Sequence, residues 1–214
     1  VEKAVKREGK SAKEVTNFYT QDFLKDLKAL NVDSKSTKFP KATDYIKEQI
    51  ALVQKLETKN LTYKTSDGIY FDTSKFKKYG ELGGIDLEGL KEGARVENNS
   101  EKKNPTDFAL WKFSGNEKRQ QEWDSPWGVG FPGWHIECSA MSMELLGEQI
   151  DIHTGGIDHI PVHHNNEIAQ SESATGKEFS SFWMHNQFLN VQNGKMAKSA
   201  ENFLRLQSVI DKGI

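Results

Sequence analysis

An α/β fold is predicted by the order of sequence patterns in the second half of the chain. From residue 125 onward the patterns run helix, strand, glycine turn, helix and strand, which is half of a doubly wound α/β sheet. A helical first sixty residues and a hairpin signal around Asp67-Gly68 precede this region. In such sheets ligands bind beyond the carboxyl ends of the strands, so function is expected near the glycine turn.

The N-terminal half begins with two expected helices. Ser11 to Glu14 reads "SAKE", the Ser-x-x-Glu form of a capping box, and apolar residues then recur at helical spacing. A second helix is expected after Pro40, with Ile46, Ile50, Val53 and Leu56 on one face. Two β-prone runs in "LTYKTSDGIYFDT" predict a hairpin, and "FALWKF" over residues 108–113 predicts a further strand.

The second half continues with a Gly/Pro loop, "SPWGVGFPG". A helix over "WHIECSAMSMELLG" is expected to end at Gly147. Next, "QIDIH" predicts a short buried strand and "TGG" a turn at its end. A helix is expected over about residues 163–174, and "FWMHNQFLNV" predicts another strand. Asn193-Gly194 is expected to turn the chain into "KMAKSAENF".

Composition excludes several classes of function. The formal net charge is -2, which gives no reason to expect nucleic-acid binding through bulk charge. No apolar run approaches the ~20 residues of a membrane span, and the opening "VEKAVKREGK" lacks the core of a signal peptide. The single cysteine fits a reducing cytosol, so a cytoplasmic location is expected. Residue 1 is valine, which suggests a fragment of a longer chain.

A metal site is suggested by the distribution of ligand-type residues. All 6 histidines and the only cysteine, Cys138, lie between His135 and His185. Zinc binds thiolate, imidazole and carboxylate, and His163 and Glu167 at i and i+4 share one helix face. His164, at i and i+3 from Glu167, would also reach it, so spacing leaves both histidines open. The alternative is a buried cysteine beside histidines at a helix start.

Nucleotide-binding elements are weaker but lie nearby. Gly155 and Gly156 after a strand allow close approach of a ligand, and Asp158 could accept hydrogen bonds from ribose; a tight turn explains the same pattern. Lys195 and Lys198 of "KMAKS" could neutralise charge on a leaving pyrophosphate, although such lysines are often a solvated surface. Trp134 could wall a small pocket.

A family resemblance covers essentially the whole chain. The ordered segments "SPWGVGFPGWHIECSAM", "DIHTGGIDHIPVHHNNEIAQSE", "FWMHNQFL" and "KMAKSAENF" resemble the catalytic domain of the cysteinyl-tRNA synthetase family, in class I of the aminoacyl-tRNA synthetases. The resemblance implies an incomplete Rossmann-like catalytic domain with an α+β connective insertion. It divides the chain into a helical remainder of the first Rossmann half (1–30), the connective insertion (31–113), the second Rossmann half with the zinc site (114–192), and the loop with the start of a helical region (193–214).

The resemblance also implies roles for single residues. One zinc ion per subunit would be held by Cys138, His163 and Glu167. A fourth ligand and the His-Ile-Gly-His signature would lie before residue 1. "KMAKS" resembles the family's Lys-Met-Ser-Lys-Ser loop with Ala197 in place of the first serine, and Lys198 would contact ATP. The remaining implied contacts are adenosine with Gly155, Gly156 and Asp158, and the cysteine substrate with Trp134 and His153.

The function implied by the resemblance is cysteine–tRNA ligation. L-cysteine would attack the α-phosphate of ATP, with Mg²⁺, to form cysteinyl-adenylate, and the aminoacyl group would pass to tRNA(Cys). A monomer is expected, and this chain alone is expected to be inactive. One alternative is a cysteine:glucosaminyl-inositol ligase, disfavoured by the Lys- and Asn-rich, Arg-poor composition. The other is a non-catalytic binding paralogue, disfavoured because the three zinc ligands and both lysines are retained.

Overall fold

The computed structural model describes residues 1–85, 99–116, 119–191, 194–196 and 204–213. The chain divides into two compact units, one formed by Pro40–His185 and the other by Val1–Phe39 with Asn186–Ile214. The larger unit contains both helices and strands, and the predicted α/β class is confirmed. Among the described residues no helix is both long and apolar enough to cross a membrane.

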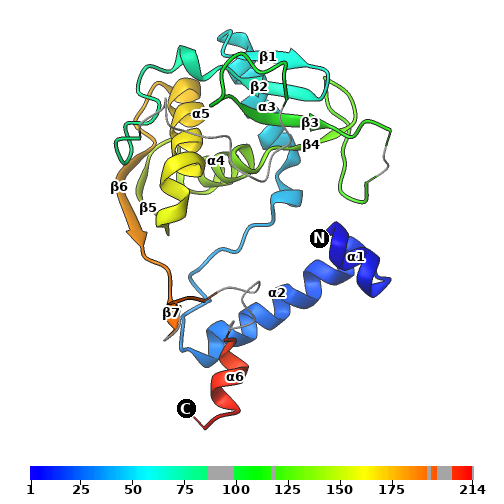
Figure 1. Ribbon diagram of the computed structural model, residues 1–214, viewed down its shortest axis with the longest axis vertical. Coiled ribbons are helices and arrows are strands. Elements are labelled where there is room, and N and C mark those ends of the chain that lie inside the picture. Colours follow the sequence, from blue (N-terminus) through cyan, green and yellow to red (C-terminus); the bar gives the residue numbers. More distant parts are fainter. Residues whose placement is uncertain (86–98, 117–118, 192–193, 197–203, 214) are drawn as a thin grey trace. The chain divides into compact units, whose positions relative to one another are not determined.

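A four-stranded antiparallel sheet lies at one side of the larger unit (Figure 1). Its spatial order is β1 (Thr62–Thr65), β2 (Gly68–Phe71), β3 (Phe108–Phe113) and β4 (Gly130–Pro132). The predicted hairpin and the predicted third strand are both present. Because Thr65 pairs with Gly68, the two-residue loop is Ser66-Asp67, one position before the expected centre. Gly68 is needed in the strand, since a Cβ there would lie 2.3 Å from the Trp111 carbonyl oxygen.

Three helices pack beneath this sheet and enclose the core: α3 (Ile46–Thr58), α4 (Trp134–Leu146) and α5 (Asn165–Thr175). The predicted apolar face of α3 is inward, and Val53 and Leu56 are fully buried. They meet Phe71, Leu110 and Trp111 from the sheet, which are equally inaccessible. Burial of these side chains stabilises the fold by roughly 1.5–3 kcal/mol each. Gly147, at φ 98°, ends α4 where the sequence predicts.

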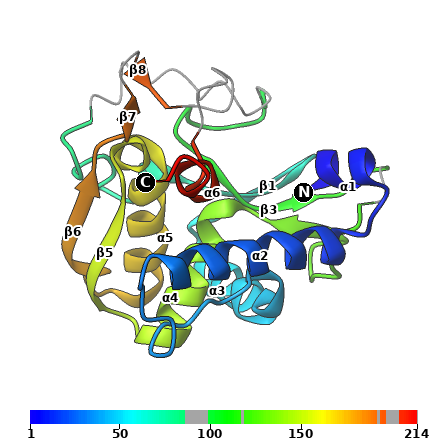
Figure 2. The same cartoon turned by 90° about the horizontal axis from the view of Figure 1, so that it is seen from below.

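A second, two-stranded sheet consists of β5 (Ile150–Gly156) and β6 (Ser180–Asn186), with α5 between them in sequence. Figure 2 shows these strands side by side, with α5 next to β5. The link from β5 to α5 is a 3₁₀ turn (Ile157–His159) and a π-helical turn (Ile160–His164). The expected strand–helix–strand order is therefore present.

Three details of this region differ from expectation. "QIDIH" is a strand but is not buried, because only Ile150 is covered and Ile152 is 55% exposed. The "TGG" segment is the extended end of β5 and not a turn. The helix expected from residue 163 begins as α5 at Asn165, because His163 lies in the preceding π turn.

The smaller unit holds the chain's two ends: α1 (Glu2–Glu8), α2 (Ala12–Ala29), β7 (Asn190–Val191), β8 (Gly194–Lys195) and α6 (Leu206–Ile210). The predicted capping box is confirmed, because the Ser11 amide donates to the Glu14 carboxylate at 2.8 Å while the Ser11 hydroxyl accepts from the Glu14 amide. "FWMHNQFLNV" is not one strand: β6 ends at Asn186, and β7 begins at Asn190. The expected turn at Asn193 and most of "KMAKSAENF" lie outside the described residues.

Candidate metal and substrate site

Three predicted zinc ligands come together from three helical segments. Cys138 lies in the first half of α4, His163 in the π turn and Glu167 in the first turn of α5, and one ligand atom of each lies within 4.8 Å of the others. The His163 Nε2 atom is 3.4 Å from Glu167 Oε2. Ligands around a tetrahedral zinc, at bonds of about 2.0–2.3 Å, stand roughly 3.3–3.8 Å apart. The separation of the His163 and Glu167 ligand atoms already lies in this range.

The packing of α4 on α5 sets this arrangement. Gln170, fully buried on α5, donates its amide both to the His135 carbonyl and to the Ser139 hydroxyl, each at 2.6 Å. Ser171 and Ser139 join at 2.8 Å. These bonds hold the two helices in one register below Cys138 and Glu167. The ligand atoms are consequently positioned by rigid elements and not by loops.

The electrostatics of the three residues favour a cation. Burial, with the nearby Glu167 and Glu137 carboxylates, raises the pKa of the Cys138 thiol to about 12. Burial and the neighbouring histidines lower the pKa of His163 to about 3, so its imidazole is neutral at pH 7. The Glu167 Oε1 atom is buried and has no hydrogen-bond partner among the described residues. A divalent cation would satisfy that oxygen and stabilise the thiolate, so the donor set fits zinc.

A second set of ligand-type atoms shares Glu167. His153, His164 and Glu167 also lie within 4.8 Å of one another. His153 Nε2 is 3.0 Å from Glu167 Oε2, and His164 Nε2 is 3.9 Å from the same oxygen. His163 and His164, the two candidate ligands that sequence spacing left open, thus both lie near Glu167. Only His163 does so together with the cysteine, and His164 instead pairs its Nδ1 with His185 Nε2 at 2.8 Å.

All 6 histidines form one cluster connected by ring contacts. The cluster is larger than the set of metal ligands and substrate contacts that the sequence predicts. His135 was not singled out, yet its Nδ1 is 2.8 Å from Nδ1 of His163. His185 was also missed. His159 places its ring 5.1 Å from that of His163. In the sequence, the only indication of these contacts is that every histidine lies between residues 135 and 185.

The predicted substrate contacts lie around this cluster. The Trp134 ring is 4.1 Å from the His163 ring and is 55% exposed, which suits a pocket wall. Gly155 has a packing reason of its own, because a Cβ there would lie 2.6 Å from the His164 ring. A Cβ on Gly156 would lie 2.5 Å from Asp158 Oδ1, and Asp158 itself is exposed. The adenosine contacts of these three residues stay a prediction.

No described contact joins Lys195 or Lys198, the lysines predicted to contact ATP, to the histidine cluster. The Lys195 backbone lies in β8, in the smaller unit, and Lys198 and Ala197 lie outside the described residues. Their roles at ATP therefore also stay predictions.

Comparison with known families decides what kind of chain this is. A family model described as the tRNA synthetases class I (C) catalytic domain matches residues 1–213. The chain belongs to this family. The Rossmann-like interpretation of its α/β fold follows from that membership.

Three similar curated relatives are named cysteine–tRNA ligase. The chain is 53% identical over 212 residues to the cysteine–tRNA ligase of Treponema denticola, covering 99% of this chain and 43% of the relative. It is 50% identical over 216 residues to cysteine–tRNA ligase 1 of Burkholderia lata, covering 100% and 46%. The Zymomonas mobilis cysteine–tRNA ligase is 50% identical over 219 residues, with 100% and 42% covered. The chain thus spans less than half the length of these relatives.

Proposed function

We propose that the native protein is a cysteine–tRNA ligase, which activates L-cysteine with ATP and transfers it to tRNA(Cys). The observation that carries the proposal is the convergence of Cys138, His163 and Glu167 within 4.8 Å, in a family whose similar members bear that name. The relatives' shared name favours this reading over an amino-sugar ligase. The retained donor set favours it over a non-catalytic paralogue.

Substrate selection in this proposal rests on one zinc ion per subunit, held by Cys138, His163 and Glu167. Zinc binds the thiolate of L-cysteine strongly and a serine hydroxyl poorly. Trp134 covers the substrate side chain, and His153 orients Glu167 through their 3.0 Å contact. Rejection of serine then needs no hydrolytic editing, because a lost metal–ligand bond discriminates strongly.

Activation consists of in-line attack by the cysteine carboxylate on the α-phosphate of ATP. Gly155, Gly156 and Asp158 would receive adenosine, and Lys195 and Lys198, with Mg²⁺, would neutralise charge on the departing pyrophosphate. The 3′ end of the tRNA then accepts the cysteinyl group. A monomeric state and a cytoplasmic location belong to the same proposal.

Replacement of the thiolate tests the proposal. In the native protein we expect Cys138→Ala to lose stoichiometric zinc and to slow cysteine-dependent ATP–pyrophosphate exchange by about 100-fold or more. Glu144→Ala is the matched control, since Glu144 is exposed on the same helix. Metal analysis and exchange assays report the two effects separately. Full zinc content in the Cys138→Ala protein would refute the ligand assignment.

A further inference from the structure

The second set of metal-ligand atoms consists of His153 on β5, His164 in the π turn and Glu167 on α5. Imidazole and carboxylate are ligands that zinc accepts, and three protein ligands leave one coordination position open. Glu167 Oε2 is 3.0 Å from His153 Nε2 and 3.9 Å from His164 Nε2. These two distances bracket the roughly 3.3–3.8 Å that separates ligand atoms around a tetrahedral zinc ion. The set therefore has the size of a metal site.

The Glu167 carboxylate has enough free capacity for two cations. It is 0% exposed, and its Oε1 atom has no hydrogen-bond partner among the described residues. A buried polar group without a partner costs about 1–3 kcal/mol, and more when it is charged. An ionised carboxylate offers two oxygens with about four lone-pair sites. One Glu167 side chain can therefore be a ligand of the Cys138 set and of the His153 set at the same time.

A hydrogen bond behind His164 supports its orientation as a ligand. His164 is 1% exposed, and its Nδ1 atom is 2.8 Å from Nε2 of His185 on β6. Metal-binding histidines are typically held in this way at the ring nitrogen that does not bind the metal, which fixes the tautomer and the ring orientation. The Nε2 atom of His164 is thus the nitrogen left for a cation, and it is the one near Glu167.

The surroundings of the two histidines hold their rings and leave room beside the ligand nitrogen. The Trp183 ring contacts both, at 4.7 Å from the His153 ring and 4.9 Å from the His164 ring. Ligand side chains locked by packing are better positioned for a metal than mobile ones. A Cβ at Gly155 would lie 2.8 Å from His164 Nε2. The glycine therefore keeps a side chain away from the atom that would bind the cation.

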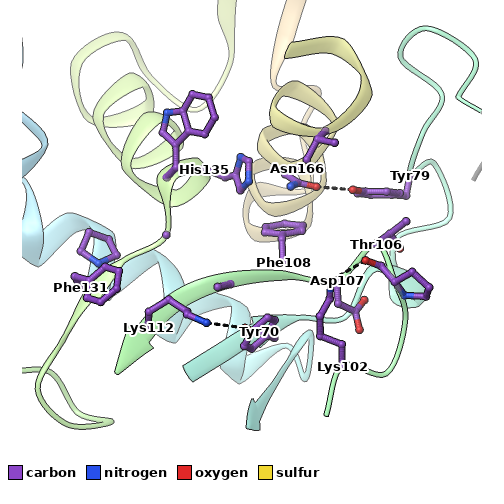
Figure 3. A pocket seen from close by; sticks show the side chains of 16 residues that line it. Tyr70, Tyr79, Lys102, Thr106, Asp107, Phe108, Lys112, Phe131, His135 and Asn166 are labelled. Carbon is purple, nitrogen blue, oxygen red and sulfur yellow. Dashed lines mark hydrogen bonds between the residues drawn. The ribbon is translucent and has the colours of Figure 1, made fainter. Parts of the chain in front are cut away.

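This set is separate from an aromatic-lined cavity of about 380 Å³ on the other side of the first turn of α4. Strands β3 and β4 form the floor of that cavity, and Phe108 and Phe131 are among its walls (Figure 3). His153, His164 and Glu167 are not among its described lining residues. They lie on the side of the histidine cluster, where the family resemblance places the contact of His153 with the cysteine substrate.

We propose that His153, His164 and Glu167 form a second divalent-cation site, which takes Zn²⁺ or Co²⁺ after the Cys138 set is filled and shares Glu167 with it. Because the second set has no thiolate, it binds zinc more weakly, and protein prepared without added metal carries only the first ion. A second cation would engage His153 and Glu167 together, so excess zinc would inhibit cysteine activation. Cation binding rests on the geometry alone, and inhibition rests on the proposed ligase function.

The test is a titration with Co²⁺ of the native protein already loaded with one zinc ion. We expect one further equivalent to bind, with the visible absorption of Co²⁺ but without the near-ultraviolet charge-transfer band of a cobalt–thiolate bond. His164→Ala removes a ligand and should weaken this binding more than about 100-fold. His185→Ala removes only the supporting hydrogen bond at a half-buried residue and should weaken it about 10- to 100-fold. His159→Asn, a histidine outside both sets, is the matched control and should bind the second equivalent unchanged.

Three results would overturn the second site. The first is that no further equivalent of Co²⁺ binds. The second is a charge-transfer band, which would show that Co²⁺ has displaced zinc at Cys138 instead. The third is full affinity for the second equivalent in the His185→Ala protein, which tests the site even if His164→Ala does not fold.

Inhibition is measured by cysteine-dependent ATP–pyrophosphate exchange at rising zinc concentration. Zinc also binds free cysteine and ATP, so the comparison with His185→Ala isolates the effect at the site. That variant should need about 10- to 100-fold more zinc for the same inhibition. Equal inhibition of both proteins would overturn the inhibitory role. Absence of exchange at every zinc concentration would contradict the ligase function, while the Co²⁺ titration still reports on the second site.

Discussion

Two sites of opposite character flank the first turn of α4. On one side, polar groups are fully buried: Glu167 is 0% and His164 1% exposed. On the other side, aromatic rings surround a single unpartnered amide. Neighbouring residues serve the two sides, since His135 and Asn166 line the pocket whereas Cys138 and Glu167 supply metal donors. The difference teaches that one helix pair can present buried ligand-type atoms and an aromatic cavity wall within one to three residues of each other.

The largest effect that separates the sites is expected from Glu167→Gln. The amide keeps the shape of the side chain but loses the charge and most of the affinity for a cation. We expect zinc affinity to fall more than about 100-fold, beyond the roughly 10- to 100-fold loss typical of a supporting partner. Competition with a chelator measures this. A zinc affinity equal to that of the unsubstituted protein would contradict the assignment of Glu167 as a ligand.

A smaller effect, on the free energy of unfolding, is expected from Gly155→Ala. This substitution acts only on the side of the histidine cluster. The added methyl would meet the His164 ring at 2.6 Å, so the ring or strand must move. Such overpacking costs about 1–3 kcal/mol in the free energy of unfolding. Urea denaturation measures the loss, with Asp151→Ala on the exposed part of β5 as control. Stability equal to that of the control would contradict the close approach.

The smallest effect is expected from His159→Asn. His159 touches Trp134, His163 and His164 by ring contacts, and it belongs to neither set of metal-ligand atoms. We expect full zinc content and a change in pyrophosphate exchange of about twofold or less. A complete loss of zinc would instead make His159 a ligand or a necessary support.

Local patterns predicted several elements of both units well. The capping box, the apolar face of α3, the hairpin and the "FALWKF" strand depend on neighbours in sequence, which the residues reveal directly. Burial of "QIDIH" was predicted wrongly, because a buried strand needs a covering layer and Ile152 has an open face. The residue pattern of a strand does not reveal which elements pack against its faces.

The parts of the site that could be predicted are those whose residues lie close together in the sequence. Glu167 and a histidine one turn before it were visible from spacing, and the resemblance selected His163. The partners His135 and His185 approach from other elements, so their contacts follow from the packing of α4 and β6. The aromatic-lined cavity at the first turn of α4 has no sequence motif, because its walls come from three strands and two helices.

The π-helical turn at Ile160–His164 has a consequence for how the chain tolerates change. A π turn carries one residue more than the α-helical turn it replaces. That extra residue sets the phase between the end of β5 and the first turn of α5. Loss of one residue here would rotate the following side chains by about a quarter of a turn, since each α-helical residue spans roughly 100°. Glu167 would then take the place of Asn166, and Ile168 that of Glu167, so the metal donors would lose their carboxylate and a deletion in this short segment would be poorly tolerated.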